Sequence, residues 1–132
     1  MNETTTQAVK APTLKGFLID CHTRTVTEVA VPDSRALNDQ SRAILDYMYR
    51  TLDVDLVTTV TLNSNSDTLW LDDEGLLKKG AVLWHYKGSQ QYFAGRGLVL
   101  GSDDEGYSTS VSDAVTLDTL RESITWTEHR LR

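Results

Sequence analysis

Hydrophobic and polar residues alternate over two stretches near the start of the chain, residues 14–20 and 24–31. In the second stretch Val29 and Val31 share one face with two threonines, while Glu28 lies on the other face. A period of two with many β-branched residues is typical of a β-strand. Only a short polar segment separates the two stretches, so we expect them to form a hairpin.

After Pro32 the hydrophobic spacing becomes that of a helix. The apolar stripe consists of Leu37, Ile44, Leu45, Met48 and Leu52. Asp33 or Ser34 can cap the start of this helix by accepting a hydrogen bond from a free backbone N–H of the first turn. We therefore predict one amphipathic helix over about residues 34–52, packed on a sheet.

Further strand patterns occur over residues 54–62, 68–71, 81–86 and 97–101. The first two are joined by a polar, turn-forming segment, which predicts a second hairpin. Near the end of the chain, Thr116 can cap a short helix that presents Leu117, Leu120 and Ile124 on one side. Residues 124–128 also alternate as a final strand would. Periodicity leaves both alternatives open at this boundary.

These elements together predict an α+β domain. We expect a mainly antiparallel β-sheet of five to six strands, with the long helix (about 34–52) and the short C-terminal helix packed on one face. A length of 132 residues fits one domain. We assign residues 14–132 to this domain and the polar residues 1–13 to a flexible N-terminal tail.

The net charge of −6 bears on the expected partners. Binding to nucleic-acid backbones requires clustered lysine and arginine, so we expect no direct nucleic-acid binding. The negative charge suits solubility, and it also suits a partner with a basic surface. The chain has no run of roughly 18 apolar residues and no apolar signal core, which predicts a cytoplasmic protein without membrane contact. The single cysteine, Cys21, rules out an internal disulfide and a cysteine-rich metal site.

Two strands run into the same acidic sequence, Asp-Asp-Glu-Gly, at residues 72–75 and 103–106. Clustered carboxylates suggest a cation site, but the spacing is not that of a calcium loop. A catalytic carboxylate pair would require the two turns to face each other across a cleft. The favoured interpretation is an exposed turn with glycine at positive φ, in which Asp103, Asp104 and Glu105 are available to a partner.

Arg96 lies between Gly95 and Gly97, immediately before an apolar strand. A guanidinium beside free backbone N–H groups can hold an anion. No nucleotide-binding fingerprint matches, because the glycines are too close together and no helix follows. A tight turn into the strand is the simpler interpretation, and an anion site at these three residues is the alternative.

Aromatic residues concentrate just before this arginine. Trp84 and Tyr86 share one face of a predicted strand, and Tyr92 and Phe93 follow the next turn. Such a row usually belongs to a core. If one face of the sheet is left uncovered, the same residues would form an exposed platform that stacks on a base or contacts a protein. The histidines, at positions 22, 85 and 129, lack metal-ligand spacing, and we predict no cofactor.

Several short motifs follow one another along the chain. They are Leu18-Ile19-Asp20 at the end of a strand, Val31-Pro32-Asp33 at the start of a helix, the first acidic turn, the Gly97–Gly101 strand, and the second acidic turn. This order is similar to an uncharacterised family of small domains found mostly in bacteriophages and mobile elements. The resemblance spans most of residues 16–126. A proline-rich link typical of the family is missing, since Lys78–Tyr86 has no proline. The resemblance implies a phage or plasmid origin and transfers no catalytic residue.

The leading functional hypothesis is a non-enzymatic accessory protein of a phage or mobile element. It would bind a host protein through its aromatic surface and acidic turns, with an inhibitor of a host defence system as the specific version. The alternative is a protein that binds a small, anionic, nucleotide-like ligand through Arg96 and nearby aromatics. An enzyme that uses the acidic turns ranks third. A homodimer through an exposed sheet edge or face is a further hypothesis.

Overall fold

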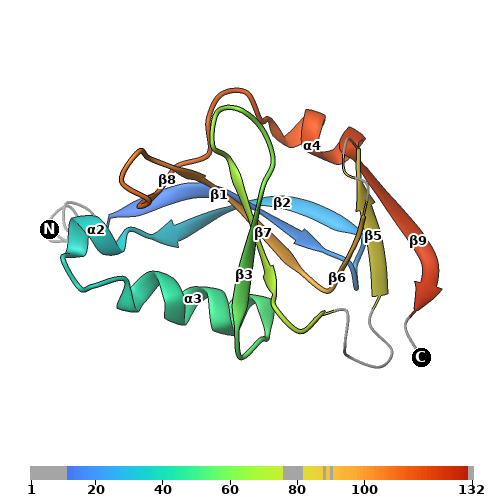
Figure 1. The fold of residues 1–132 in the computed structure, drawn as a ribbon, viewed down its shortest axis with the longest axis horizontal. Helices are drawn as coiled ribbons and strands as arrows, with labels where there is room; N and C mark the ends of the chain where they lie inside the picture. Colours follow the sequence, from blue (N-terminus) through green and yellow to red (C-terminus); the bar gives the residue numbers. More distant parts are fainter. Residues whose placement is uncertain (1–11, 76–81, 88, 90, 131–132) are drawn as a thin grey trace, which may run out of the picture.

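The computed structural model describes residues 12–75, 82–87, 89 and 91–130 (Figure 1). The predicted tail, residues 1–13, falls largely outside these ranges, although Thr13 already belongs to the first strand. The elements are β1 (Thr13–Asp20), β2 (Thr25–Pro32), α2 (Ser34–Leu37), α3 (Arg42–Leu52), β3 (Val57–Thr61), β4 (Thr68–Asp72), β5 (Val82–Tyr86), β6 (Tyr92–Ala94), β7 (Gly97–Ser102), β8 (Ser108–Thr109), α4 (Leu117–Ser123) and β9 (Ile124–Arg130). The predicted α+β class with mainly antiparallel strands is confirmed.

The strands form two sheets, where the sequence pattern predicted one. The larger is six-stranded, with the order β2-β1-β7-β4-β3 and with β8 added to β7; the smaller has the order β6-β5-β9. Both predicted hairpins form, β1 with β2 and β3 with β4. The chain passes from the small sheet to the large one between β6 and β7, across Gly95 and Arg96 (Figure 1). This short bend joins the two sheets.

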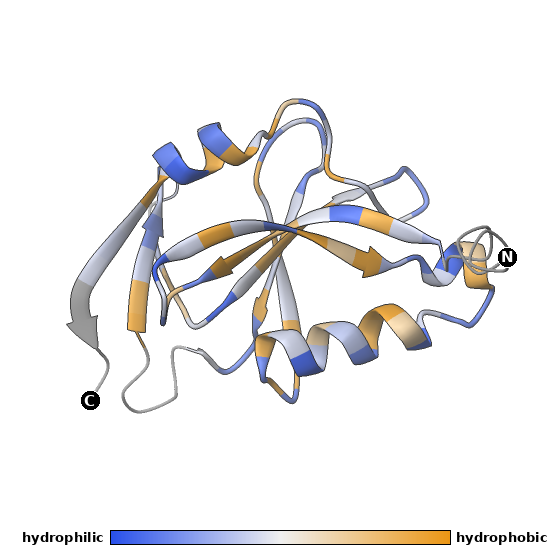
Figure 2. Ribbon diagram, turned by 180° about the vertical axis from the view of Figure 1, so that it is seen from behind, coloured by the Kyte–Doolittle hydropathy of each residue, from blue (hydrophilic) through white to orange (hydrophobic). Residues whose placement is uncertain are grey.

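The two faces of the large sheet are covered by different elements. Successive residues of β7 point to opposite faces: Leu98 belongs to the hydrophobic cluster of Met48 on α3, whereas Val99 belongs to that of Trp84 on β5 and Leu120 on α4. Hydrophobic residues accordingly run along the central strands, and the connecting loops are mostly hydrophilic (Figure 2). The helices therefore pack on opposite faces, which corrects the prediction that both pack on one face, and the small sheet shares one face with α4.

The predicted helix over residues 34–52 is interrupted. Asp33 caps α2 as expected, by accepting a hydrogen bond from the backbone N–H of Ala36 at 3.1 Å. Residues 38–41 then leave the helix, with positive φ at positions 38, 40 and 41. The carboxylate of Asp39 starts the second helix, α3, by accepting from the N–H groups of Arg42 and Ala43. A side chain that competes for backbone donors thus divides the stripe into two helices.

Both alternatives for the C-terminal segment are realised, one after the other. Thr116 and Thr119 form a reciprocal capping box at the start of α4. The helix ends at Ser123, and β9 begins at Ile124 and pairs with β5. The register of this pairing places Trp126 directly opposite Trp84. These elements complete the hydrophobic cluster that contains Trp84, Val99 and Leu120.

Candidate functional site

A groove of about 330 Å³ opens where the outer strands of the two sheets meet, between β3 and β4 of the large sheet and β6 of the small one. Its floor is apolar and consists of Val60, Leu71, Phe93 and Ala94. Its rim carries polar groups, from Thr58, Asp72, Asp73, Gln91 and Tyr92. We call this feature the β3–β6 groove. An apolar floor with a polar rim is the usual character of a binding site.

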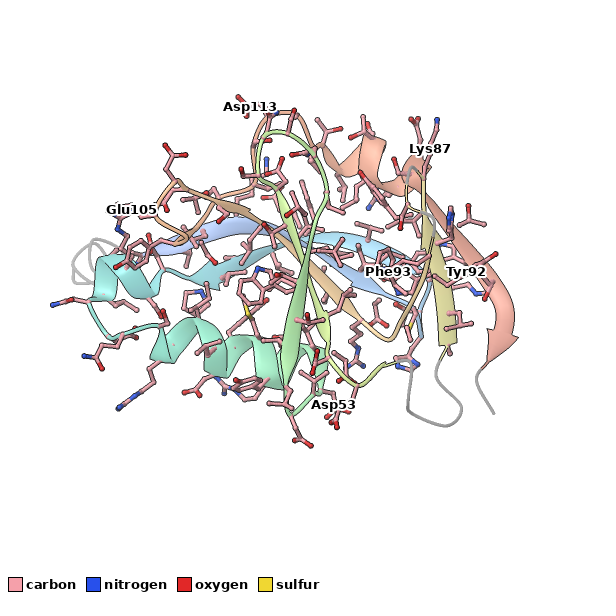
Figure 3. The ribbon with its side chains drawn as sticks, in the orientation of Figure 1. Asp53, Lys87, Tyr92, Phe93, Glu105 and Asp113 are labelled. Carbon is pink, nitrogen blue, oxygen red and sulfur yellow. The ribbon has the colours of Figure 1, made fainter. Side chains whose placement is uncertain are left out.

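Tyr92 is the exposed aromatic residue of this groove. Its side chain keeps 51% of its surface accessible, and its ring lies 5.3 Å from that of His85. Phe93, the next residue, is buried at 3% exposure and packs 5.1 Å from the ring of Trp84. Successive residues of β6 point to opposite faces, and Figure 3 labels Phe93 on the side of β5 toward the large sheet and Tyr92 on the other side. Phe93 therefore belongs to the buried floor of the groove, whereas Tyr92 borders the groove with an exposed ring that lies beside His85.

The predicted aromatic platform is wrong for Trp84, which is completely buried. Its indole N–H donates to the carbonyl oxygen of Gly95 at 2.8 Å, so the core alternative applies. Tyr86 is half-buried against the same cluster. Burial raises the pKa of Tyr86, and the negative charge of Asp67 raises it further. Of the three aromatic residues predicted to bind a partner, Tyr92 is the exposed one.

The first acidic turn, residues 72–75, borders the groove. Asp72 accepts a hydrogen bond from the backbone N–H of Glu74 at 2.9 Å, and the N–H of Asp73 donates to the carbonyl of Leu56 at 3.0 Å. Gly75 lacks the predicted positive φ, and it packs against the backbone of Ala94, where a Cβ would lie 3.2 Å from the carbonyl oxygen. The turn is thus tied to both sheets, with the side chains of Asp73 and Glu74 exposed to solvent.

The second acidic turn is held by an arginine from α2. Arg35 forms ion pairs with Asp103 at 2.5 Å and with Glu105 at 2.9 Å, and its guanidinium lies 4.4 Å from the ring centre of Tyr107. Gly106 has the predicted positive φ, +87°. Asp104 is exposed on the same turn. Asp103 and Glu105 therefore bind within the molecule, and Asp104 remains on the surface.

The two acidic turns lie far apart. The antiparallel pair β4–β7 aligns Leu71 with Gly97 and Thr68 with Leu100, so the turn after β4 and the turn after β7 lie at opposite ends of the pair. Figure 3 places Glu105 at the far end of the molecule from Tyr92. At about 3.3 Å per residue this separation is roughly 20 Å, which excludes a carboxylate pair shared by the turns. Within the described ranges no group of three or more His, Cys, Asp or Glu side chains is placed to hold a metal ion.

Arg96 is engaged inside the fold. Its Nε lies 3.5 Å from the carboxylate of Asp20, and one terminal nitrogen donates to the carbonyl of Thr51 at the end of α3, at 3.4 Å. Gly95 has a φ of +80°, and a Cβ on Gly97 would lie 2.9 Å from Leu69. The predicted tight turn is therefore confirmed. The guanidinium links β1, α3 and the bend between the sheets.

One buried polar residue was missed by sequence analysis. Asp67 is 0% exposed and accepts hydrogen bonds from the side-chain amide of Asn63 at 2.9 Å and from the backbone N–H and hydroxyl of Ser112 at 2.8 and 2.5 Å. Its position in a polar, turn-forming segment suggested exposure. The bonds tie the β3–β4 turn to the loop before α4.

The remaining reactive side chains are placed as ordinary structural groups. Cys21 is buried, and the imidazole of His85 bonds to the carbonyl of Ser89 at 2.8 Å. His22 is exposed, and the side chain of His129 lies outside the described side chains. No helix in the described part of the chain is long and apolar enough to span a membrane.

Comparison with known sequences identifies a family. The model of the family described as "Domain of unknown function (DUF3846)" matches residues 16–124. This match covers most of the chain, so the chain belongs to that family. No curated protein and no solved structure gives a match. The predicted membership of an uncharacterised family is confirmed.

Proposed function

We propose that this member of the DUF3846 family is a non-enzymatic binding domain, whose β3–β6 groove accepts an extended, basic segment of a partner protein. The observation that supports this most is the apolar floor of the groove, next to the exposed ring of Tyr92 and the acidic rim. Apolar side chains of the segment would enter the floor between Leu71 and Phe93. Its lysine or arginine side chains would meet Asp72 and Asp73 on the rim.

The groove lies at two sheet edges, which favours an extended partner. β3 is the outermost strand of the large sheet, and β6 is the outermost strand of the small one. An edge strand offers unpaired backbone groups that can take up a further strand. Backbone hydrogen bonds would supply sequence-independent affinity, and the apolar floor would select alternate side chains.

The charge of the chain supports a basic partner. The net charge is −6, and the groove rim contributes Asp72 and Asp73. Attraction between opposite charges at a rim speeds the encounter of the two proteins, and this attraction weakens as the salt concentration rises. In the narrower version of the proposal, the chain is a phage or mobile-element accessory protein in the host cytoplasm. Its partner is then a host defence protein, whose basic nucleic-acid-binding surface it occludes.

The small-ligand alternative at Arg96 has less support. Asp20 and the carbonyl of Thr51 already contact the guanidinium, and the buried ring of Trp84 offers no stacking surface. An anion at this bend would have to displace Asp20. We therefore place the groove first.

Native mass spectrometry of the tagged chain, purified from its natural source at low salt, tests the proposal. The groove variant carries Asp73→Asn and Tyr92→Ala. The matched control carries Asp104→Asn and Tyr107→Ala, the equivalent acid of the other turn and a tyrosine of similar exposure, 46% against 51%. We expect a protein partner that is bound by the wild type and the control and is lost in the groove variant.

Two results would count against the groove. One is a complex that survives in the groove variant and resists high salt. The other is a complex lost only in the control variant, because this would move the interface to the turn around Glu105. A dimer mass that disappears in the groove variant would show that a second copy of the chain occupies the sheet edge, as in the homodimer hypothesis. The proposed basic partner would then be replaced by this second copy.

A further inference from the structure

The β3–β6 groove borders two sheet edges, and the hydrogen-bond register of each edge decides which of them can accept a partner strand. Along an antiparallel strand, successive residues direct their backbone N–H and C=O groups alternately toward the paired strand and away from it. In the β3–β4 hairpin the N–H of Leu62 donates to the carbonyl of Asp67 at 2.8 Å, and the N–H of Asp73 donates to the carbonyl of Leu56 at 3.0 Å. Both bonds continue the register of the hairpin, so the backbone groups of residues 56, 58, 60 and 62 face β4.

The backbone groups of Val57, Thr59 and Thr61 therefore point away from β4, along the outer edge of the large sheet. β3 is the last strand of that sheet, and no hydrogen bond in the described part of the chain reaches these outward groups. Thr59 and Thr61 are exposed, and Val57 is half-buried. The edge thus offers donors and acceptors at every second residue, which is the spacing that an added strand requires.

The side chains of an added strand would alternate between the two faces in step with those of β3. Thr58 and Val60 line the β3–β6 groove, whereas Val57 packs against the cluster of Met48 on the other face. Residues directly opposite each other in antiparallel strands share a face. The partner residues opposite Thr58 and Val60 would therefore enter the groove, and the residue between them would not.

The edge of β6 offers less room for a strand. The N–H of Gly95 donates to the carbonyl of Val82 at 3.2 Å, and the same alternation directs the backbone groups of Tyr92 and Ala94 away from β5. Gly75 lies against the outward carbonyl of Ala94, since a Cβ on Gly75 would come within 3.2 Å of its oxygen. The first acidic turn thus obstructs this edge, and β3 is the better acceptor.

β3 also lacks the sequence features that protect an edge strand from pairing. Exposed edges commonly carry charged residues or proline. Among the other outer strands, β2 contains Glu28 and ends at Pro32, and the sequence of β9 contains Glu128 and Arg130. β3 reads Val-Thr-Thr-Val-Thr, which is uncharged and β-branched throughout. Leu56, immediately before it, keeps 52% of its surface exposed. An unprotected edge beside an exposed leucine indicates an interaction surface.

We propose that the partner segment adds to β3 as an antiparallel strand, which pairs with Val57, Thr59 and Thr61 and places two apolar side chains in the groove. Antiparallel pairing is favoured because it is slightly more stable per residue than parallel pairing. A basic residue two positions further along would cover Leu56 with its aliphatic stem and direct its charge toward Asp73. The segment therefore reads apolar-x-apolar-x-basic, where x is polar. This motif presupposes the protein-binding function proposed for the groove. A second copy of the chain is disfavoured as the occupant, because two chains of net charge −6 repel each other.

The test is amide hydrogen exchange of the full chain, followed by NMR, with the capped peptide Thr-Leu-Thr-Leu-Thr-Lys-Lys as the probe. In the free chain, the N–H groups of Thr59 and Thr61 should exchange at least about tenfold faster than those of Thr58 and Val60, which bond to β4. Saturating peptide should slow exchange at Thr59 and Thr61 by about tenfold or more. The register is overturned if Thr58 and Val60 exchange faster in the free chain, or if the peptide binds without protecting Thr59 and Thr61.

Two kinds of change separate backbone pairing from side-chain contact. Thr59→Pro removes one outward N–H and should weaken peptide binding by about tenfold or more, whereas Thr59→Val keeps this N–H and should leave the affinity unchanged. Methylation of the peptide at the backbone nitrogen of its third residue, which faces β3, should weaken binding in the same way. Methylation at the following leucine, which faces away from β3, should not. Equal weakening by the two methylations would overturn the strand pairing. The methylated peptides leave the protein unchanged, so they decide the question even if Thr59→Pro does not fold.

The groove variant used for mass spectrometry separates this inference from the proposed function. Peptide binding that is lost in the groove variant but is insensitive to methylation and to Thr59→Pro would keep the groove as a binding site and overturn strand addition. No saturable binding of the peptide at millimolar concentration would overturn the motif, whereas a natural partner lost in the groove variant would still support the groove. Protection of Thr59 and Thr61 in the concentrated free chain that vanishes on dilution would place a second copy on this edge and overturn both proposals.

Discussion

The indole N–H of Trp84 donates to the carbonyl oxygen of Gly95 over 2.8 Å, and this bond fastens β5 to the bend between the two sheets. The bend is the point at which β6 leaves the small sheet and β7 enters the large one. Because Phe93 packs on the same ring, the bond also fixes the floor of the β3–β6 groove. The groove is therefore built on a rigid support.

Replacing Trp84 with phenylalanine should lower the free energy of unfolding by about 1–3 kcal/mol, because the Gly95 carbonyl loses its donor inside the core. The matched control is Trp70→Phe. The indole nitrogen of Trp70 is buried and has no hydrogen-bond partner among the described residues, so its removal should cost less. Urea denaturation measures both. Equal losses in the two variants would mean that the bond to Gly95 contributes nothing beyond ring packing.

Asp67→Ala should lower the free energy of unfolding by about 3 kcal/mol or more, because the partly buried donors of Asn63 and Ser112 would lose their buried acceptor. Ser112→Ala removes one of these bonds and should cost about 1 kcal/mol. Asp113→Ala is the control on the same loop, since Asp113 is exposed (Figure 3) and should change stability by less than about 0.5 kcal/mol. Chemical denaturation that ranked Asp113→Ala beside Asp67→Ala would refute the buried network.

The second acidic turn predicts a pH dependence. Partial burial acts to raise the pKa of Asp103, but hydrogen bonds from the backbone of Tyr107 and Glu105 and the charge of Arg35 outweigh it, so the pKa lies below its ordinary value of 3.8. A lowered pKa in the folded state gives stability that is present above the unfolded pKa and is lost as the pH falls through the folded one.

Asp103→Asn should therefore melt at a lower temperature than the wild type at neutral pH, and this gap should close as the pH falls through the lowered pKa of Asp103. Asp104→Asn, the exposed neighbour, should show no comparable gap. Thermal melts across this pH range decide the matter. A gap for Asp103→Asn that stays constant down to acid pH would show that the carboxylate charge is not its cause.

Arg96 is expected to act as a structural link. Arg96→Ala should lower the free energy of unfolding by about 1 kcal/mol, because Asp20 loses its ion-pair partner and the Thr51 carbonyl loses a donor. A double-mutant cycle with Asp20→Asn measures the coupling, and the two losses should be less than additive. Fully additive losses, together with a phosphate effect on the wild type that disappears in Arg96→Ala, would restore the anion-binding hypothesis.

Local patterns predicted the local elements of the fold. The alternation of residues 24–31 and the polar segment before Thr68 predicted two hairpins that form. The helix break needed more than the apolar stripe. The carboxylate of Asp39 accepts from the first N–H groups of α3, although Ser41 is the N-cap residue, and an acid between the apolar positions was the available signal. The division into two helices could thus be predicted from the sequence, but only from its polar residues.

Such local patterns could not predict contacts between segments that are far apart in the sequence. The row that includes Trp84 predicted either a core or an exposed platform, and the choice depended on whether β9 pairs with β5 to make a second sheet. Arg96 and Asp20 likewise meet only because β1 pairs with β7.

Site-directed photo-cross-linking in the natural source tests the protein-binding groove most directly. A photoreactive phenylalanine analogue would replace either Tyr92 in the groove or Tyr107 on the second acidic turn, two tyrosines of similar exposure. The proposal predicts that position 92 captures one protein through a basic, extended segment, more weakly as salt rises, and that position 107 does not. Capture at position 107 alone, or equal capture at both positions, would contradict it.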